Sequence, residues 1–415
     1  MDVPDFSAPG ATERNQPEIC DVPVLRMLAG ERRTVGIAAA LYAVRMLGLF
    51  MLLPVLALYA YELEGASLFL AGIAVGAYGL TQAAFQIPFG ILSDRYGRIP
   101  VILVGLAIFA GGSVVAATST SIAGVISGRA LQGAGAISAV LTALVADGTR
   151  DAIRTRAMAL IGVTIGGSFV VSLLAGPTLT ALIGVAGLFW LTAALALAGM
   201  ALLLFALPAE ARTAQPRAAL SLEGLKRAAR DRTLLALDFG VFVLHLILSA
   251  TFTAVPFVLR DALGVVPEDQ WPIYAGALLV SLVGTVPLIL WTERGGRPQV
   301  VLLTAVAGVG AAQLVLGFGG SSTMLGALAL FFAAFNYLEA RLPAMLAGAA
   351  PADGRGAALG VYASSQYLGI FAGGALGGGL LGRFGPDGVF LLCAAAAAIW
   401  LILCRYGFSR PFNRP

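Results

Sequence analysis

The residues best suited to chemistry in this sequence are protonatable side chains inside long apolar stretches. Asp238 and His245 lie seven residues apart within 234–258, and Glu339 lies within 324–346. On a helix this spacing puts Asp238 and His245 on one face, about 10 Å apart along the axis. His245 is the only histidine, and an imidazole changes charge near neutral pH. These groups indicate proton uptake and release. Glu339 is our first choice for the titrating carboxylate, and a fixed pair with a basic residue is the alternative.

Two arginines within other apolar stretches could act on these acids. A charge inside a bilayer costs about 2.5–3.5 kcal/mol on insertion scales, so each one requires a partner or a function. Arg129, in 122–145, would lower the pKa of a nearby carboxylate and make its proton release depend on geometry. Arg45, near the middle of 36–58, would face the bundle interior and attract a carboxylate or an anionic substrate. For both arginines, a fixed structural role is the alternative.

Uncharged polar residues complete the candidate site. Asn336 precedes Glu339 by three residues and therefore shares its helix face. Three glutamines in other apolar stretches could also reach a substrate: Gln82 and Gln86, which are four residues apart, and Gln366. For these glutamines, hydrogen bonding between helices is the role that we favour.

The composition indicates what must position these residues. Hydrophobic residues make up 59% of the 415 residues and charged residues 12%, against about 25% charged in soluble domains. Lipid must therefore surround most of the chain. A spanning helix needs roughly 20 apolar residues, and the continuous apolar runs lack the alternation of barrel strands. We predict an all-α polytopic membrane protein with twelve transmembrane helices, at 36–58, 68–91, 99–118, 122–145, 157–182, 185–207, 234–258, 273–291, 299–318, 324–346, 357–381 and 387–405.

Basic residues give the expected orientation. If the N-terminus lies inside, 21 of the 26 lysines and arginines fall in cytoplasmic segments, and Arg45, Arg129 and Arg341 fall within predicted spans. The predicted periplasmic loops hold only Arg260 and Arg383. This asymmetry follows the positive-inside rule and predicts a multi-pass protein of a bacterial inner membrane with both termini in the cytoplasm. It also argues against nucleic-acid binding, because the basic residues are spread along one membrane face and form no patch.

The chain divides into two six-helix halves joined by a linker. The linker is basic and has a helical pattern, so it is either a helix at the membrane interface or a solvated connection. We predict a cytoplasmic N-terminal tail at 1–34, a first half at 35–207, a cytoplasmic linker at 208–233, a second half at 234–406 and a cytoplasmic C-terminal tail at 407–415.

The two halves carry the same short loop. Asp94-Arg95-Tyr96-Gly97-Arg98 follows the second predicted helix of the first half, and Glu293-Arg294-Gly295-Gly296-Arg297 follows the second predicted helix of the other. Both copies read acid, Arg, any residue, Gly, Arg. Parallel six-helix repeats with a substrate site between them near the midplane are a known transporter arrangement.

The first copy belongs to a longer motif, Gly90-Ile91-Leu92-Ser93-Asp94-Arg95-Tyr96-Gly97-Arg98. It resembles the signature loop of the major facilitator superfamily, G-x-L-[AS]-D-R-x-G-R followed by a basic residue. The sequence departs from that pattern after Arg98, where Ile99-Pro100 replaces the second basic residue. Arg129 with the two glycines of Gly133-Ala134-Gly135 resembles a second family signature. Gly176-Pro177 resembles the helix-5 pair of the antiporter branch, although its flanking residues match loosely.

The resemblance implies a cavity lined by the predicted helices 36–58, 122–145, 234–258 and 324–346. It also links Arg129 to proton handling. The signature loop, with Gly90, Asp94, Arg95, Gly97 and Arg98, would act as a latch between the halves at the cytoplasmic side. We expect Asp94 to accept hydrogen bonds at the N-terminus of 357–381, where the helix dipole favours an anion, and Arg98 to pair with Asp147. Breaking this latch would be one step of alternating access.

The function that we expect is proton-coupled antiport, the efflux of small amphipathic organic molecules. A sugar or metabolite exporter or importer of the same fold is the alternative. It is disfavoured because such a cavity needs many hydrogen-bonding side chains and the helix interiors offer few. A sensor or scaffold that does not transport is a third possibility, against which the charges within the membrane argue.

Enzymatic functions find no support in the sequence. The chain has no G-x-x-x-x-G-K-[ST] phosphate loop and no hydrolytic constellation. Its three cysteines are scattered, without metal-ligand spacing. We therefore expect no cofactor and no metal. The expected partners are a small-molecule substrate, protons and the lipid bilayer, with the protein acting as a monomer.

Overall fold

The structure is a computed structural model that describes residues 26–207, 222–294, 297–351 and 354–407. Within these ranges the chain is helical almost throughout, and one isolated bridge between Glu64 and Ser121 is its only strand-like feature. Ten helical stretches there are long and apolar enough to span a membrane. The predicted all-α membrane fold is confirmed.

Two of the ten stretches contain two crossings each. α7 (Asp151–Ala206) has 56 residues and α14 (Arg355–Ile402) has 48. At about 1.5 Å per residue, each is far longer than the roughly 30 Å hydrocarbon core. Each is broken by one glycine with a positive φ, Gly184 at 69° and Gly385 at 68°, a conformation that glycine adopts without strain. With both stretches counted twice, the described chain has the twelve crossings that the apolar runs predict.

Two predicted helices of the first half are interrupted, which corrects the sequence-based ranges. The range 36–58 breaks between Phe50 and Leu56, where Pro54 lacks a backbone donor. The range 122–145 breaks after Ala134, where Gly135 lies so close to α4 that a Cβ would be 2.3 Å from the Gly105 carbonyl oxygen. The helices are α1 (Ala29–Phe50), α2 (Leu56–Tyr61), α3 (Leu68–Tyr96), α4 (Arg98–Thr118), α5 (Ile122–Ala134), α6 (Ser138–Asp147) and α7.

The boundaries of the predicted tails and linker lie close to helix ends. α1 begins at Ala29, within the predicted tail 1–34, and α10 begins at Arg232, within the predicted linker. The linker contains the short helix α9, while its residues 208–221 lie outside the described chain, as do 1–25 and 408–415. After the linker helix α9 (Leu222–Ala228), the second half comprises α10 (Arg232–Asp261), the 3-10 helix Pro267–Asp269, α11 (Trp271–Glu293), α12 (Pro298–Phe318), the 3-10 helix Ser321–Thr323, α13 (Met324–Ala349), α14 and the π-helical Leu403–Gly407.

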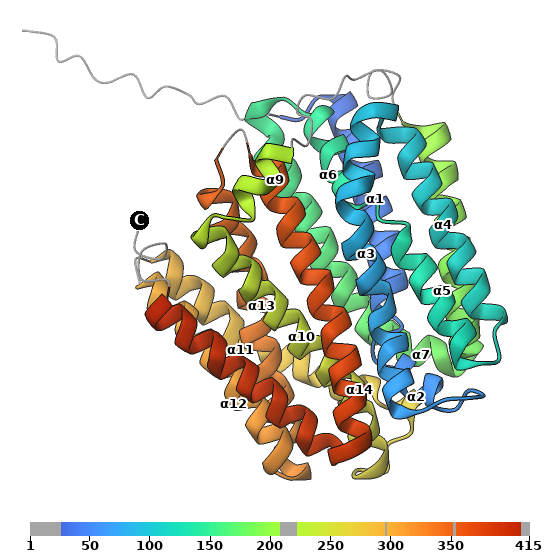
Figure 1. The fold of residues 1–415 in the computed structure, drawn as a ribbon, viewed down its shortest axis with the longest axis vertical. Coiled ribbons are helices and arrows are strands. Elements are labelled where there is room, and N and C mark those ends of the chain that lie inside the picture. The colour runs from blue at the N-terminus through green and yellow to red at the C-terminus, as the bar shows by residue number, and fades with distance from the viewer. Residues whose placement is uncertain (1–25, 208–221, 295–296, 352–353, 408–415) are drawn as a thin grey trace, which may run out of the picture.

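The first part of α14 lies between the two halves, beside α3 of the first half and α10 of the second (Figure 1). Adjacent glycines make both contacts. A Cβ on Gly373 would lie 2.2 Å from the Leu246 carbonyl oxygen in α10. A Cβ on Gly374 would lie 2.5 Å from the Gly72 carbonyl oxygen in α3. Small residues that let helix backbones approach this closely are typical of packing in membranes.

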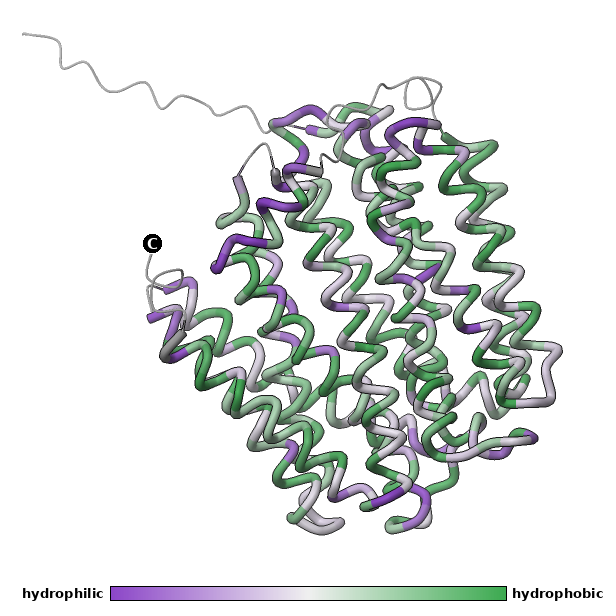
Figure 2. The backbone as a smooth tube through the Cα atoms, in the orientation of Figure 1, coloured by the Kyte–Doolittle hydropathy of each residue, from purple (hydrophilic) through white to green (hydrophobic). Residues whose placement is uncertain are grey.

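The polar residues concentrate at the helix ends. Figure 2 shows hydrophobic residues along the middles of the helices and hydrophilic residues gathered at the end that holds α6 and α9. Arg98, Arg150 and Lys226 belong to this end, which we call the basic end. The second copy of the repeated loop lies between α11 and α12, as expected, although its Gly295 and Gly296 lie outside the described chain.

Candidate proton-coupling site

Three polar side chains from three helices of the second half meet in mid-helix positions. His245 lies on α10, Glu339 on α13 and Gln366 on the first part of α14. Gln366 Nε2 lies 2.8 Å from His245 Nε2 and 3.3 Å from Glu339 Oε1. His245 Nε2 lies 3.7 Å from Glu339 Oε2. The structure thus brings together two of the predicted proton-coupling residues and adds a glutamine to them; we call these three residues the coupling cluster.

The coupling cluster is buried on one side and accessible on the other. The His245 side chain is 4% exposed, and its ring meets the Phe335 ring edge-on. The Glu339 side chain is 35% exposed although it faces His245 and Gln366. Asn336, one turn away on α13, is half-buried, and its contact with a substrate stays a prediction. Glu339 Oε2, the oxygen nearest the imidazole, is buried, so Glu339 links a partly exposed side chain to a buried imidazole beside it.

Asp238 and Tyr362 extend the polar region toward the basic end. Asp238 is 5% exposed, and neither of its carboxylate oxygens has a hydrogen-bond partner among the described residues. Tyr362 on α14 is equally buried, and its hydroxyl has no hydrogen-bond partner in the described chain; it interacts electrostatically with Glu339 and Asp238. Buried polar groups are normally hydrogen-bonded. These two side chains therefore offer hydrogen-bonding capacity that no described protein group uses.

Arg45 lies in a network of neutral side chains in the first half. It is fully buried and donates to Tyr78 Oη at 2.6 Å, Gln82 Oε1 at 2.7 Å and Ser138 Oγ at 3.2 Å. Gln82 donates in turn to Gln86 Oε1 at 2.8 Å. No ion pair with Arg45 is seen within the described ranges. The network joins α1, α3 and α6, so it supports a structural role, and substrate contact by Arg45, Gln82 or Gln86 stays a prediction.

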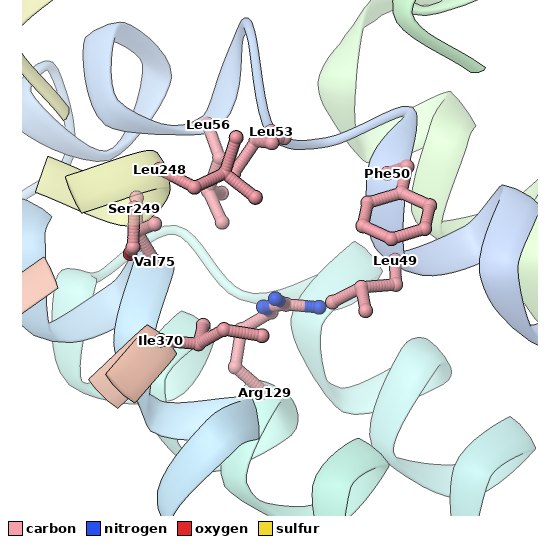
Figure 3. A pocket seen from close by; sticks show the side chains of 9 residues that line it. All are labelled: Leu49, Phe50, Leu53, Leu56, Val75, Arg129, Leu248, Ser249 and Ile370. Carbon is pink, nitrogen blue, oxygen red and sulfur yellow. The ribbon is translucent and has the colours of Figure 1, made fainter. Parts of the chain in front are cut away.

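Arg129 on α5 is also buried, with 2% exposure. Its Nη1 donates to Gln132 Oε1 at 2.8 Å, and its guanidinium lies over the Tyr78 ring. In the part of the chain that the structure describes, Arg129 makes no ion pair, so its effect on a carboxylate stays a prediction. Figure 3 shows the guanidinium directed into a cavity of about 20 Å³, room for roughly one water molecule, between the halves. The cavity is lined by Leu49, Phe50, Leu53, Leu56, Val75, Arg129, Leu248, Ser249 and Ile370.

The signature loop forms one of its two expected contacts. Arg98 Nε donates to Asp147 Oδ2 at 2.9 Å, Nη1 donates to Ser93 Oγ at 2.6 Å, and Arg98 also pairs with Asp94. Gly97, between α3 and α4, has a φ of 89° that favours glycine. All these bonds lie within the first half. The contact of Asp94 with the N-terminus of α14, which would join the halves, stays a prediction.

The Gly176-Pro177 pair lies inside α7, against the break that follows α1. A Cβ on Gly176 would lie 2.4 Å from the Met51 carbonyl oxygen. Glycine is therefore required for α7 to approach the interrupted backbone. The motif has a packing role here, and any further role in antiport stays a prediction.

Sequence reasoning missed several partners of these residues. Arg150 Nε lies 2.9 Å from Glu31 Oε1, which ties the loop before α7 to the start of α1 at the basic end. Glu31 was assigned to the tail, and no local pattern singles it out. Tyr78 and Tyr367 were also missed, because an aromatic residue in an apolar run is indistinguishable from ordinary core.

Comparisons with known proteins show what this chain resembles. A profile of the Major Facilitator Superfamily matches residues 38–265 and 237–415. Inner membrane transport protein YajR of Escherichia coli is 44% identical over 379 residues, which cover 91% of this chain and 83% of YajR. Multidrug resistance protein 2 of Bacillus subtilis is 28% identical over 318 residues, covering 72% of this chain and 78% of that protein. The fold is similar to that of a bacterial homologue of the human lysosomal transporter Spinster, described as inward-facing and occupied, with a TM-score of 0.70, 15% identity and coverage of 94% and 100%.

Proposed function

This chain belongs to the major facilitator superfamily, and we propose that within it the protein is a proton-coupled antiporter that exports small amphipathic organic molecules by alternating access. The family and the fold make it a multi-pass membrane transporter and not an enzyme. The observation that carries the proposal is the coupling cluster, where an imidazole and a carboxylate from different helices lie 3.7 Å apart inside an apolar bundle.

Antiport requires that substrate and protons exclude each other from one site. The partly exposed Glu339 carboxylate attracts a cationic or hydrogen-bond-donating group of a substrate when it is ionised, and loses that attraction when it is protonated. His245 beside it becomes positive on protonation and repels a cation further. The proton gradient then supplies the driving force, since moving one charge through 100 mV contributes about 2.3 kcal/mol.

An amphipathic substrate fits the side chains better than a sugar. A sugar site needs many free hydrogen-bonding groups, whereas Arg45, Gln82 and Gln86 hydrogen-bond to their neighbours. The small space between the halves, which has room for about one water molecule in this structure, is lined almost wholly by aliphatic and aromatic residues. Similarity to Multidrug resistance protein 2 of Bacillus subtilis agrees with this substrate class. Transport of a sugar or metabolite is the alternative.

The proposal includes an orientation and a latch. We place the basic end in the cytoplasm of a bacterial inner membrane, with both termini on that side, following the positive-inside rule. In the outward-facing state the signature loop would hold the halves together there, with Asp94 engaging the start of α14. The partners are protons and one small molecule, with no nucleic acid, and the protein acts as a monomer.

The test uses purified protein in liposomes that contain a pH-sensitive dye. An outward gradient of cationic dyes, biocides or sugars is imposed, and proton movement is recorded for the native protein and for Glu339→Gln. Glu268→Gln is the matched control, because Glu268 is exposed and lies between α10 and α11, away from the cluster. We expect substrate-dependent proton flux in the native and control proteins and its loss in Glu339→Gln.

The other outcomes are equally informative. Unchanged flux in Glu339→Gln would move the coupling role to His245 or Asp238. Transport of a substrate without any proton movement would refute antiport with protons and leave a uniporter or another coupling ion.

A further inference from the structure

The hydrogen bonds around His245 fix which ring nitrogen carries the proton. Nδ1 lies 3.1 Å from the carbonyl oxygen of Val241. A carbonyl oxygen can only accept, so Nδ1 is the protonated nitrogen of the neutral ring. Nε2 therefore presents a lone pair, and Gln366 Nε2 donates to it at 2.8 Å. The arrangement satisfies both nitrogens of an uncharged imidazole.

A second contact holds the Gln366 amide in this orientation. The same nitrogen donates to Glu339 Oε1 at 3.3 Å, and an ionised carboxylate can only accept. If the amide turned over, its own oxygen would face the His245 lone pair and the carboxylate, and three acceptors would meet without a donor. One NH₂ group thus serves neutral His245 and ionised Glu339 together.

We infer that Gln366 is a positioning residue that sets the proton affinity of His245 and Glu339, an inference that rests on the proposed proton-coupled function. Protonation of His245 places a hydrogen on Nε2, which the NH₂ group of Gln366 cannot accept. The amide must then turn or leave. The charged ring finds a new acceptor in Glu339 Oε2, which is 3.7 Å away and has no hydrogen-bond partner among the described residues. Gln366 therefore changes partners whenever His245 gains or loses a proton.

Other charged or titratable groups surround His245 on the elements that pack against it. Glu339 faces it from α13, and Tyr362 lies on α14, one turn from the glutamine. Asp238 lies two turns away on α10, and Arg129 of α5 lines the cavity beside the next turn of α10. Asp238, Tyr362 and Arg129 make no hydrogen bond to the imidazole within the described ranges, so they affect it only through longer-range electrostatics.

The residue after Gln366 contacts the other half of the bundle. Tyr367 Oη lies 3.5 Å from Ser138 Oγ, and its ring meets the Tyr78 ring edge-on. Ser138 and Tyr78 are both partners of Arg45. Gln366 therefore lies on the helix that contacts both halves, and its neighbour Tyr367 makes one of those contacts.

The test exploits the presence of a single histidine, because histidine labelled with ¹⁵N reports on His245 alone. Its NMR signals are recorded across pH in the full-length protein in lipid nanodiscs. We expect the neutral ring of the native protein to carry its proton on Nδ1. We expect Gln366→Met, which is similar in size but lacks a donor, to raise the midpoint of the titration by about one pH unit, a tenfold change in proton affinity. The reason is that the NH₂ group no longer favours the neutral ring.

Gln313→Met is the matched control. Gln313 is a buried glutamine of α12 that accepts a hydrogen bond from Thr251 and does not belong to the cluster. Its variant should leave the midpoint unchanged. A neutral ring protonated on Nε2, or an unchanged midpoint in Gln366→Met, would overturn the inference. The tautomer of His245 is measured in the native protein, so this result is obtained even if a variant does not fold. Failure of the proposed antiport would appear separately, as a lack of proton flux in liposomes.

Discussion

Arg98 Nε, at the start of α4, donates a hydrogen bond of 2.9 Å to Asp147 Oδ2, at the end of α6. Both side chains are almost fully buried. The pair joins two helices of the same half, and Arg98 also holds Ser93 and Asp94 of α3. The signature loop is therefore braced within its own half. A latch between the halves requires this loop to make one further contact. Arg98 would then hold the loop within its own half, and Asp94 would make the contact with the other half.

The Arg98–Asp147 pair should contribute strongly to stability. Removing one partner of a buried ion pair costs about 3–5 kcal/mol. We expect Arg98→Ala to lower the free energy of unfolding by this amount, measured by denaturant unfolding in detergent. Arg154→Ala is the control, because its partner Asp151 is 86% exposed and such pairs contribute at most about 1 kcal/mol. Equal effects of the two substitutions would contradict the account.

The Arg45 network distinguishes a structural role from substrate binding. Arg45 reaches three acceptors on two helices, whereas a lysine has a single nitrogen. We expect Arg45→Lys to destabilise the protein by about 1–3 kcal/mol for each buried acceptor left unsatisfied. Arg33→Lys, at an exposed position on α1, should have almost no effect. If unfolding is unchanged and the KM for substrate rises, Arg45 binds substrate directly.

The contact between α3 and α14 should require glycine at residue 374. A Cβ there would lie 2.5 Å from the Gly72 carbonyl oxygen and 2.9 Å from the Gly76 nitrogen, and backbone atoms cannot move aside. We expect Gly374→Ala to push the halves apart. A thiol reagent should then label Val75→Cys, in the cavity between the halves, several-fold faster in a chain whose native cysteines are replaced.

Gly379→Ala is the control for this experiment. A Cβ at residue 379 would lie 3.5 Å from the Phe69 side chain, an ordinary contact, so labelling should not change. Equal labelling rates in the two alanine variants would show that α3 and α14 do not hold the halves together.

The crossings could be predicted from the sequence because apolar runs of sufficient length have one stable solution in lipid. The interruptions after Phe50 and Ala134 could not, because they depend on close approach of other helices. Gly176 of α7 packs on the first break, and Gly105 of α4 packs on the second. Those neighbours are distant in sequence, so no local sequence pattern predicts the two breaks.

The candidate site could be predicted residue by residue but not as a constellation. A polar side chain in an apolar run is conspicuous, and this signal found His245, Glu339 and Gln366. It favoured hydrogen bonding between helices for Gln366 but could not name the partners, because the hydrogen bonds to His245 and Glu339 arise only when α10, α13 and α14 pack together. The Arg98–Asp147 pair was found because the loop motif suggested it.

The most direct test of the central claim is whether substrate binding displaces protons. Protein in nanodiscs is held at low buffer capacity near neutral pH, a transported substrate is added, and proton release is read with a pH indicator. Linkage requires that substrate affinity also fall as pH falls. We expect proton release by the native protein and none by Glu339→Gln. Proton uptake on binding, or binding with no proton change in the native protein, would contradict it.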